Sequence, residues 1–500
     1  MENRIACSKL REKIMTADQA AEMIKTEMLV AFGGYTSSGY PKKIARALTK
    51  KHIKEKDFKI RMLTGANTGP LDTILGEADL VSWRAPMIES KVMSNLVNCG
   101  EVHYVEQQMN RMPQMIEEEW FGKIDFAVIE AISILENGEI VPTSSVGMVP
   151  HFLEKAEKII VEINTVQPEV FEGMHDIYLP LQHQNEPIPL TQISQRIGQP
   201  FLSVDTDKIV AIVESDELDQ AVSVGENKPQ ICKIAQNLLS FLRKEAQNFP
   251  DGKIPALQTG FGNLATEIAR ELARSEFKDL SFFCGGITEA VLELIVLGKV
   301  KAISTGSIQM TPRAVQLLKE QPELFRDKIV IRNTDITNRA ETIGRMGIIA
   351  LTSGIEMDIY GNVNSSHIAG IKVVNGLGGG ANFAENAALS ILLIPAESKN
   401  GAISAIVPMV SHQDICEHDI DVVITENGVA DLRGKDDLQR ATEIIENCAG
   451  PHYKEQLKEY LIRAKQQVGG HHPQILEEAF SWHIRLQQTG TMQEFCEEEI

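Results

Sequence analysis

Short runs of apolar, largely β-branched residues recur along the whole chain and alternate with stretches of helical pattern. The runs lie at residues 28–32, 59–63, 125–130, 158–163 and 208–213, and again at 280–283, 301–305, 328–331, 348–352, 403–407 and 421–424. Continuous runs of this kind are typical of parallel strands that are buried on both faces. Helical patterns such as 41–50 and 265–274 separate them. The alternation predicts an α/β protein with open parallel sheets.

The two halves of the chain echo each other. The segment IARAL at 44–48 returns 224 residues later as IAREL at 268–272, and each copy follows a glycine-rich turn. At 500 residues the chain also exceeds what one core normally holds. We therefore expect two related domains, 1–225 and 226–500, with the boundary in the polar stretch 214–228 or the loop 246–253. A ligand is expected between them.

Charge and cysteine usage exclude several classes of function. The formal charge is −20 and the pI is about 5.1, so the surface repels nucleic acid and anionic membranes. An anionic ligand then needs a locally basic or amide-rich pocket.

The seven cysteines have no CxxC spacing, which argues against a disulfide framework or a zinc ribbon. No apolar run approaches the roughly 18 residues that span a bilayer, and the start has no signal-peptide pattern. We expect a cytoplasmic protein.

Two glycine-rich loops are the first candidates for ligand contact. GFGNL at 260–264 lies between an expected strand and a helix, where backbone N–H groups can bind an anion; a plain turn is the alternative. It lacks the third glycine of a dinucleotide fingerprint. NGLGGGANF at 375–383 has four glycines in five residues, which favours close backbone approach to a ligand or an oxyanion hole over a flexible loop. No Walker motif follows.

Three groups of polar side chains are further candidates. Glu289 follows a strand and the turn Gly285-Gly286, at the edge where α/β proteins place their sites, although a helix dipole alone also favours an acidic first turn. The acidic and potentially metal-ligating residues at 412–419 suggest a metal site. The spacing of the histidines in this segment, however, suits neither a strand face nor an HExxH helix. The pair at 83–84, Trp-Arg, fits either core packing or a substrate contact.

Taken in order, these motifs resemble the family I CoA-transferases. The matching segments are ALQTGFGNLA, ITE, DIYGNVNSSHIAG, NGLGGGANFAENA, AISAIVPMVSH and CEHDIDVVITENGVADLRG, preceded by MLVAFGGYTSSGYPK, IRMLTGAN and ADLVSWRAP. The most similar branch is the acetyl-CoA hydrolase/transferase group, which includes succinyl-CoA:acetate and propionyl-CoA:succinate CoA-transferases. The resemblance implies two NagB/RpiA-like α/β domains and a homodimer. It implies acyl-CoA and short-chain carboxylates as substrates, with no metal and no permanently bound cofactor.

The resemblance also assigns roles to individual residues. Glu289 matches the nucleophile, and the backbone N–H groups of Phe261 and Gly379 match an oxyanion hole. Asn338 matches a position near the thioester, and Glu426 matches a second active-site carboxylate. The implied CoA-binding positions are Gly260, Phe261, Gly262, Asn263, Leu264, Ile355, Asn375, Gly379 and Lys399.

The chain departs from the family pattern at two places near these residues. Cys284 to Ile287 read as four added residues before Thr288 and Glu289, so the position of the carboxylate is the weakest match. Asn382 replaces an aspartate that follows the glycine loop in close relatives, which removes one negative charge.

The implied activity is CoA transfer between short-chain carboxylates, with succinyl-CoA and acetate as the expected pair. A glutamyl-CoA thioester on Glu289 would form and react in ping-pong order. The alternatives are an acyl-CoA hydrolase that uses the same glutamate, and a CoA-sensing or sugar-phosphate-binding relative without catalysis.

Overall fold

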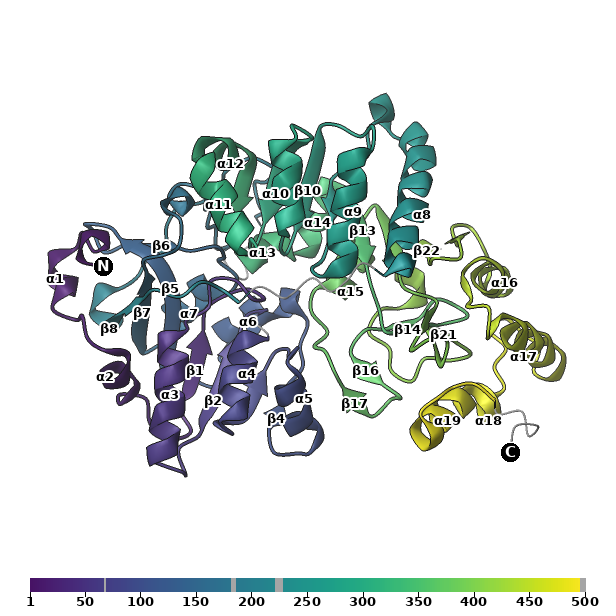
Figure 1. Ribbon diagram of the computed structural model, residues 1–500, viewed down its shortest axis with the longest axis horizontal. Helices are drawn as coiled ribbons and strands as arrows, with labels where there is room; N and C mark the ends of the chain where they lie inside the picture. Colours follow the sequence, from purple (N-terminus) through teal and green to yellow (C-terminus); the bar gives the residue numbers. More distant parts are fainter. Residues whose placement is uncertain (67–68, 181–185, 221–227, 495–500) are drawn as a thin grey trace.

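Two parallel-stranded sheets, one in each half of the chain, form the framework of the computed structural model (Figure 1). The structure describes residues 1–66, 69–180, 186–220 and 228–494. The domain boundary predicted at 225/226 lies outside these residues. None of the helices within these ranges is long and apolar enough to cross a membrane.

The first sheet contains seven parallel strands and one short antiparallel strand. Their spatial order is β4 (His103–Tyr104), β3 (Val81–Ala85), β2 (Ile60–Thr64), β1 (Leu29–Phe32), β5 (Phe126–Ile134), β7 (Lys158–Asn164) and β8 (Ile209–Ser215), with β6 (Ile140–Pro142) antiparallel to β5. β1 and β5 are fully or almost fully buried, as their continuous apolar runs predict.

The second sheet repeats the strand order of the first. It runs β12 (Ile329–Ile331), β11 (Val300–Thr305), β10 (Leu280–Cys284), β9 (Leu257–Gln258), β13 (Ile349–Thr352), β18 (Leu389–Leu393), β22 (Val422–Ile424) and the antiparallel β23 (Val429–Asp431). In both halves the first strand lies centrally, the next three extend to one side, and the later strands extend to the other. The α/β fold with two related parallel sheets is therefore confirmed.

One predicted strand has a different place. The run 403–407 is divided between β20 (Ile403–Ser404) and β21 (Ile406–Val407), which lie outside the large sheet. β21 pairs with β14 (Glu356–Asp358), which in turn pairs with β15 (Val363–Asn364), whereas β20 pairs with β19 (Glu397–Ser398). A hairpin of β16 (His367–Ile368) and β17 (Lys372–Val373) extends beside them. Extended structure at 403–407 is therefore confirmed, but as two short strands outside the large sheet, because an apolar run does not specify which strand it pairs with.

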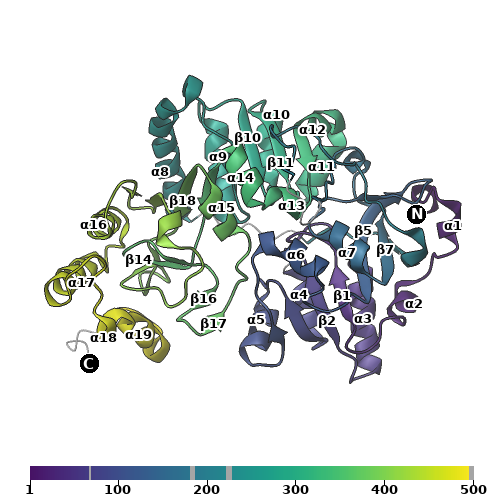
Figure 2. The same cartoon turned by 180° about the vertical axis from the view of Figure 1, so that it is seen from behind.

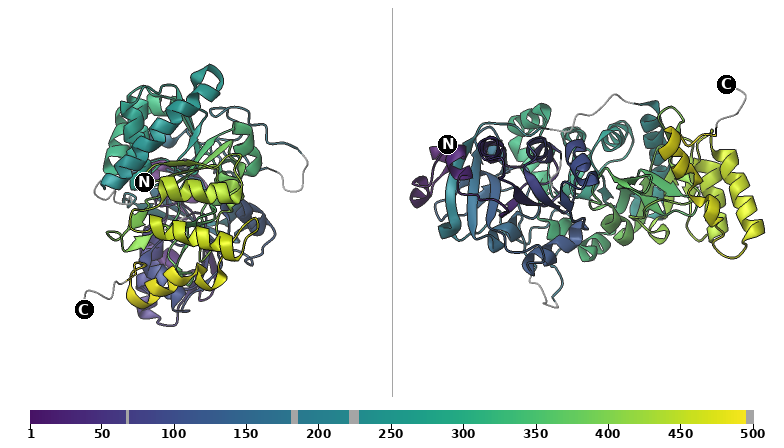
Figure 3. Two further views of the ribbon diagram at one scale, coloured as in Figure 1. Left: turned by 90° about the vertical axis from the view of Figure 1, so that its right-hand side faces the viewer. Right: turned by 90° about the horizontal axis from the view of Figure 1, so that it is seen from below.

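Helices cover both faces of the sheets, and four C-terminal helices form an outer flank (Figures 1, 2 and 3). The apolar face of a helix explains this packing. In α9, for example, Ile268, Ala269 and Leu272 recur at helical spacing and are buried. The helices are α1 (Ser8–Arg11), α2 (Ala17–Ala21), α3 (Lys43–Lys54), α4 (Pro70–Glu77), α5 (Lys91–Asn98), α6 (Met112–Glu117), α7 (Val149–Lys155), α8 (Pro229–Glu245), α9 (Asn263–Arg274), α10 (Glu289–Val296), α11 (Pro312–Glu320), α12 (Pro322–Lys328), α13 (Thr334–Thr337), α14 (Ala340–Met346), α15 (Gly380–Asn386), α16 (Asp437–Cys448), α17 (Lys454–Gln467), α18 (Leu476–Ala479) and α19 (Ser481–Thr489).

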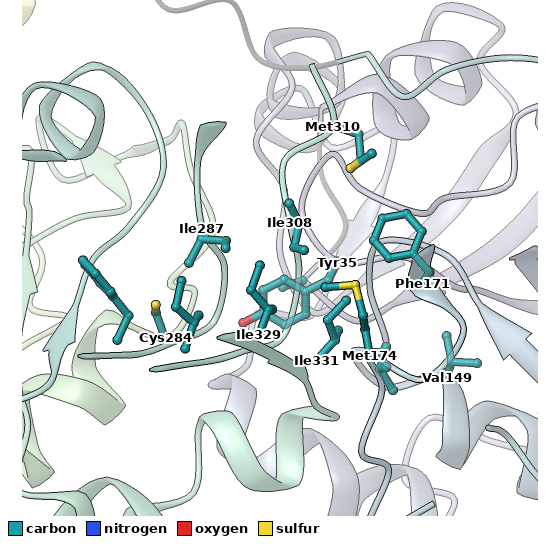
Figure 4. Close-up of a cluster of buried hydrophobic side chains, with 14 of the residues drawn as sticks. Tyr35, Val149, Phe171, Met174, Cys284, Ile287, Ile308, Met310, Ile329 and Ile331 are labelled. Carbon is teal, nitrogen blue, oxygen red and sulfur yellow. The ribbon is translucent and has the colours of Figure 1, made fainter. Parts of the chain in front are cut away.

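The two halves share one apolar core. Figure 4 shows Tyr35, Val149, Phe171 and Met174 of the first half packed against isoleucines that include Ile308, Ile329 and Ile331 of the second half. Backbone bridges also cross the boundary, between residues 145 and 307, 147 and 333, and 175 and 331. A shared core and backbone pairing together hold the halves in one relative position.

A buried histidine adds a charged contact at this boundary. His151 donates from Nε2 to Asp335 Oδ2 (2.8 Å) and from Nδ1 to Glu117 Oε1 (3.1 Å). Burial works to lower the pKa of His151, but Asp335 and Glu117 together raise it to about 10. Because this pKa is raised above the unfolded value of about 6.5, the contact stabilises the fold fully below that pH and loses its contribution as the pH rises through 10.

We therefore expect His151→Gln to lower the free energy of unfolding at pH 6.5 by an amount on the order of a few kcal/mol. The difference from the unmodified protein should shrink steadily toward pH 10. Urea unfolding of both proteins across this pH range measures it. A difference that stays constant with pH would contradict a charged His151.

Candidate functional site

A cavity of about 330 Å³ lies between the two halves, within the size range of small-ligand pockets. Its lining is rich in glycine and in short polar side chains. The second half contributes Gln258, Thr259, Gly260, Phe261, Gly285, Gly286, Asn338, 351–355, Ser365, 375–380, Phe383 and Ile415, and the first half contributes Tyr35, Thr36, Ser37, Ala66, Met87, Ile88 and Glu89. The expectation of a ligand site between the halves agrees with this position.

The carboxyl ends of parallel strands build one wall of the cavity. Gly260 and Phe261 follow β9 and precede α9, whereas Gly285 and Gly286 follow β10. Gly286 lies directly under the Phe261 ring, and a Cβ at this position would collide with the ring. The glycine therefore permits the two loops to approach each other, as sites at the ends of parallel strands require.

The glycine loop 375–380 forms the opposite wall and is held by the first half. Gly376 N–H donates to the carbonyl of Ile88, and Leu377 N–H donates to Glu106 Oε1 at 2.9 Å. Burial raises the pKa of Glu106. These contacts hold the loop in place. The sequence alone did not decide whether this loop approaches a ligand or is flexible.

Tyr35 and Asn338 meet across the boundary inside the cavity. The Tyr35 hydroxyl lies 3.4 Å from Asn338 Oδ1, which also accepts from Thr337 Oγ1 at 2.8 Å. Burial raises the pKa of Tyr35 well above its usual value, so the phenol stays protonated and can donate. Asn338 is fully buried, and its Nδ2 has no hydrogen-bond partner among the residues that the structure describes. A buried amide donor without a partner marks a place where a ligand oxygen fits.

The structure does not bring Glu289 into the cavity. The turn Gly285-Gly286 borders the cavity instead, and the chain enters α10 at Glu289. Thr311 Oγ1, at the start of α11, donates a hydrogen bond to the Glu289 carboxylate. Residues 284–287 place Gly285 and Gly286 at the end of β10, and the role that the resemblance gives to Glu289 stays a prediction.

The other residues implied by the resemblance divide into two groups. Gly260, Phe261, Ile355, Asn375 and Gly379 line the cavity together with Asn338. Gly262, Asn263 and Leu264 are not part of the lining, because α9 begins at Asn263 and leads away.

Glu426 supports a neighbouring segment. Its carboxylate accepts from Gln230 Nε2 at 3.0 Å and from Ala396 N–H at 2.9 Å, and it does not line the cavity. The first bond connects the end of β22 to the start of α8, and the second connects it to the residue just before β19. Glu426 therefore holds the segment that leads to Lys399.

A second cavity of about 370 Å³ adjoins the first. Ile355 lines both, and Lys399 and Lys372 bring positive charge to the second. Exposed apolar side chains, Ile368 and Ile371, also line it. The two cavities are therefore neighbours, and the second combines apolar side chains with two lysines.

The metal hypothesis for residues 412–419 takes a different form in the structure. His412 Nε2 lies 3.1 Å from Asp414 Oδ1, and its ring stacks on His367 with centroids 3.9 Å apart. Donor atoms of Glu106, His367 and His412 lie within 4.8 Å of one another, and so do those of Cys416, Glu417 and His418 within the predicted segment, so either group could hold an ion. Sequence spacing did not indicate the first group, because Glu106 belongs to the other half.

The structure also shows the surroundings of Trp83, Arg84 and Asn382, whose roles the sequence did not decide. Arg84 is buried and donates to Asp72 Oδ1 at 2.8 Å, whereas Trp83 packs on Phe121, so this pair serves core packing. Asn382 is buried, and its Nδ2 donates to Gln108 Oε1 at 3.1 Å. Asn382 thus connects α15 to the first half and does not line the cavity.

Sequence reasoning missed the lining residues of the first half, above all Tyr35, Met87 and Glu89. One signal was available for Tyr35. The glycine-rich turn at 33–39 occupies the place in the first half that 260–264 occupies in the second. The turns that follow the central strands β1 and β9 both border the cavity.

Comparison with known proteins identifies relatives along the whole chain. Residues 2–214 match the acetyl-CoA hydrolase/transferase N-terminal domain, and residues 319–461 match the acetyl-CoA hydrolase/transferase C-terminal domain. The chain is 41% identical to a succinyl-CoA:acetate CoA-transferase of Clostridium kluyveri, covering 98% of this chain and 92% of that protein. It is 35% identical to an acetyl-CoA hydrolase of Candida glabrata, covering 98% and 97%. The crystal structure of RipA from Yersinia pestis shares the fold, with a TM-score of 0.71 at 20% identity over 90% of this chain and 97% of that one.

Proposed function

The chain belongs to the acetyl-CoA hydrolase/transferase family and is an enzyme of that family, and we propose that it transfers CoA from succinyl-CoA to acetate. The succinyl-CoA:acetate CoA-transferase at 41% identity supports this choice of substrates. A homodimer and a cytoplasmic location stay predictions from the resemblance and the sequence.

One observation carries the proposal: two adjoining cavities meet at Ile355. Lys399 in the second cavity suits the phosphates of CoA, since the chain as a whole carries a net charge of −20 and an anionic ligand needs a locally basic site. The pantetheine arm would pass Ile355, so that the thioester enters the cavity between the halves. Binding of the distant nucleotide can offset the cost of orienting and desolvating the reacting groups.

The glycine loops suit the chemistry of a thioester. A nucleophile that attacks the thioester carbonyl creates a tetrahedral oxyanion, which needs aimed hydrogen-bond donors. The backbone N–H groups of Phe261 and Gly379, on opposite walls of the cavity, would supply them. Glycine leaves such N–H groups accessible because no side chain covers them.

The covalent route through Glu289 stays a prediction from the resemblance. It would require the carboxylate to leave Thr311 and pass the Gly285-Gly286 turn to reach the thioester. The second candidate activity is hydrolysis of acetyl-CoA or another short-chain acyl-CoA, in which water takes the place of the acceptor acid. The Candida glabrata acetyl-CoA hydrolase supports it.

Product analysis separates these activities. The enzyme is incubated with succinyl-CoA, with and without acetate, and all CoA species are quantified by chromatography. Transfer gives acetyl-CoA and succinate in equal amounts, only when acetate is present. Free CoA in both incubations would favour hydrolysis, and unchanged succinyl-CoA would overturn the proposal.

Lys399→Ala is expected to raise the KM for succinyl-CoA about tenfold and to leave kcat nearly unchanged. A phosphate contact far from the reacting bond stabilises the bound substrate and the transition state equally, so its loss weakens binding without slowing the chemical step. Steady-state kinetics measure both constants. Lys319→Ala, a lysine beside a different cleft of the protein, is the matched control. Equal KM values for the two variants would place the nucleotide elsewhere.

A further inference from the structure

Two histidines of the second half and one carboxylate of the first half meet beside the glycine loop 375–380. His367 lies in β16, and its ring stacks on that of His412. One donor atom from each of these histidines and one from Glu106 lie within 4.8 Å of one another. None of the three residues lines the cavity between the halves or its neighbour at Lys399. The cluster is therefore separate from the site of the proposed reaction.

Hydrogen bonds decide which ring nitrogens of this cluster carry protons. Ser366 Oγ donates its one proton to Asp414 Oδ2 at 2.7 Å, so it accepts from His367 Nδ1 at 2.8 Å. His412 Nε2 lies 3.1 Å from Asp414 Oδ1, a contact that places a proton on Nε2. In the neutral histidines, Nε2 of His367 and Nδ1 of His412 then keep their lone pairs. Neither nitrogen has a hydrogen-bond partner among the residues that the structure describes.

Asp414 orients both rings. It contacts His412 directly and His367 through the Ser366 hydroxyl, and its own side chain is only 3% exposed. The Ser365 N–H donates to the same carboxylate at 2.6 Å. Histidines that bind a metal ion usually donate their second ring N–H to a carboxylate or a neighbouring polar group in this way, which fixes the ring and the tautomer.

Glu106 supplies a third donor atom from across the boundary. Its Oε1 accepts from Leu377 N–H at 2.9 Å and from the Tyr104 hydroxyl at 3.4 Å, which leaves Oε2 for another partner. Within the described part of the chain, neither Glu106 nor Asp414 forms an ion pair with a lysine or an arginine. Two neighbouring carboxylates without a basic partner would be balanced by one divalent cation.

The other group that could hold an ion is less well prepared. Cys416, Glu417 and His418 are consecutive residues, and the His418 side chain is 78% exposed. The one contact of the His418 ring, at 3.5 Å from Nδ1, is with Glu417 Oε1 of the same group. No separate carboxylate orients this histidine among the described residues, so the group serves as the control.

We propose that Glu106, His367 and His412 bind one Zn²⁺ ion, which joins the two halves of the protein beside the glycine loop. Two imidazole nitrogens and one carboxylate oxygen are a ligand set that Zn²⁺ prefers over the oxygen-seeking Mg²⁺ and Ca²⁺, and water can take the fourth position. The ion takes no part in CoA transfer. Its effect is to hold Glu106, and through it the backbone of Leu377, across the boundary.

The test uses the full-length protein, freed of metal with a chelator and titrated with Zn²⁺ in a calorimeter. We expect one tight equivalent per chain, and X-ray absorption at the zinc edge should show two imidazoles and no sulfur. His367→Ala and His412→Ala should each abolish the tight equivalent. Asp414→Asn should weaken it about 10–100-fold, the usual effect of losing a group that orients a ligand. His418→Ala should bind as the unmodified protein does.

Unfolding measurements distinguish a lost ligand from a damaged fold. Zn²⁺ in excess should stabilise the unmodified protein and His418→Ala against urea, because an ion bound only by the folded state raises its stability. It should not stabilise His412→Gln, which keeps a polar side chain of similar size. No tight equivalent in the unmodified protein, a sulfur ligand in the absorption spectrum, or tight binding that survives in both His412 variants would overturn the proposal.

Discussion

Replacing Asn338 with alanine is expected to lower kcat/KM for CoA transfer by about 10²–10³-fold, the usual effect of removing one donor aimed at developing charge. Asn338 is fully buried, lines the cavity and has an Nδ2 without a partner among the described residues. Its loss removes this donor and also the acceptor of the Tyr35 and Thr337 hydroxyls. Steady-state kinetics with succinyl-CoA and acetate measure the effect.

Asn338→Asp is the matched variant, since it keeps the shape and exchanges the donor for an acceptor. It should be at least as inactive as the alanine variant, because a carboxylate at this position would repel the developing oxyanion. Urea unfolding of both variants controls for folding. If Asn338→Asp keeps the kcat/KM of the unmodified protein, the amide does not act at the reacting centre.

Lys42→Met is expected to destabilise the protein by about 3–5 kcal/mol, the usual cost of removing one partner from a buried ionic cluster. Lys42 Nζ lies 2.5 Å from Glu130 Oε2 and 2.7 Å from Asp219 Oδ1, and all three side chains are almost fully buried. Burial works to lower the pKa of Lys42, but the two carboxylates hold it above its usual range. Without the lysine, two buried carboxylates would keep only neutral hydrogen-bond donors and lose their cationic partner.

The pKa of Glu130 gives this prediction a pH signature. Burial raises it to about 8 even with Lys42 nearby, so without the lysine the carboxyl should bind a proton still more readily. The Lys42→Met variant should therefore be least destabilised at low pH. A triple variant, Lys42→Met with Glu130→Gln and Asp219→Asn, should recover part of the loss. Urea unfolding at pH 6 and 8 measures all of these, and an equally stable single variant would contradict the account.

Much of the fold follows from local pattern. The runs at 125–130 and 158–163 became the buried central strands β5 and β7, because β-branched residues between helices suit parallel sheets. The echo of 44–48 at 268–272 corresponds to α3 and α9, which follow the central strands of two sheets with one strand order. Local pattern could not place 403–407, since its partners β14 and β19 are short and irregularly spaced.

Part of the site was also predicted from local sequence pattern. Glycine-rich loops at the ends of strands are visible in the sequence, and Phe261, Gly379 and Asn338 all line the cavity. The placement of Glu289 depends on the backbone conformation of residues 284–287, and no sequence motif specifies that conformation. Tyr35 and Glu106 act on the site from the other half, across more than 250 residues of sequence. Contacts of that kind come from packing of the halves, which a local pattern does not encode.

The central claim is that a thioester reacts in the cavity between the two halves. A crystal structure of the enzyme with bound CoA tests it most directly. We expect the sulfur between Phe261 and Gly379, the pantetheine arm past Ile355, and the phosphates near Lys399. CoA bound in the separate cleft lined by Arg4, Lys319 and Arg326, with the cavity between the halves unchanged, would contradict the account.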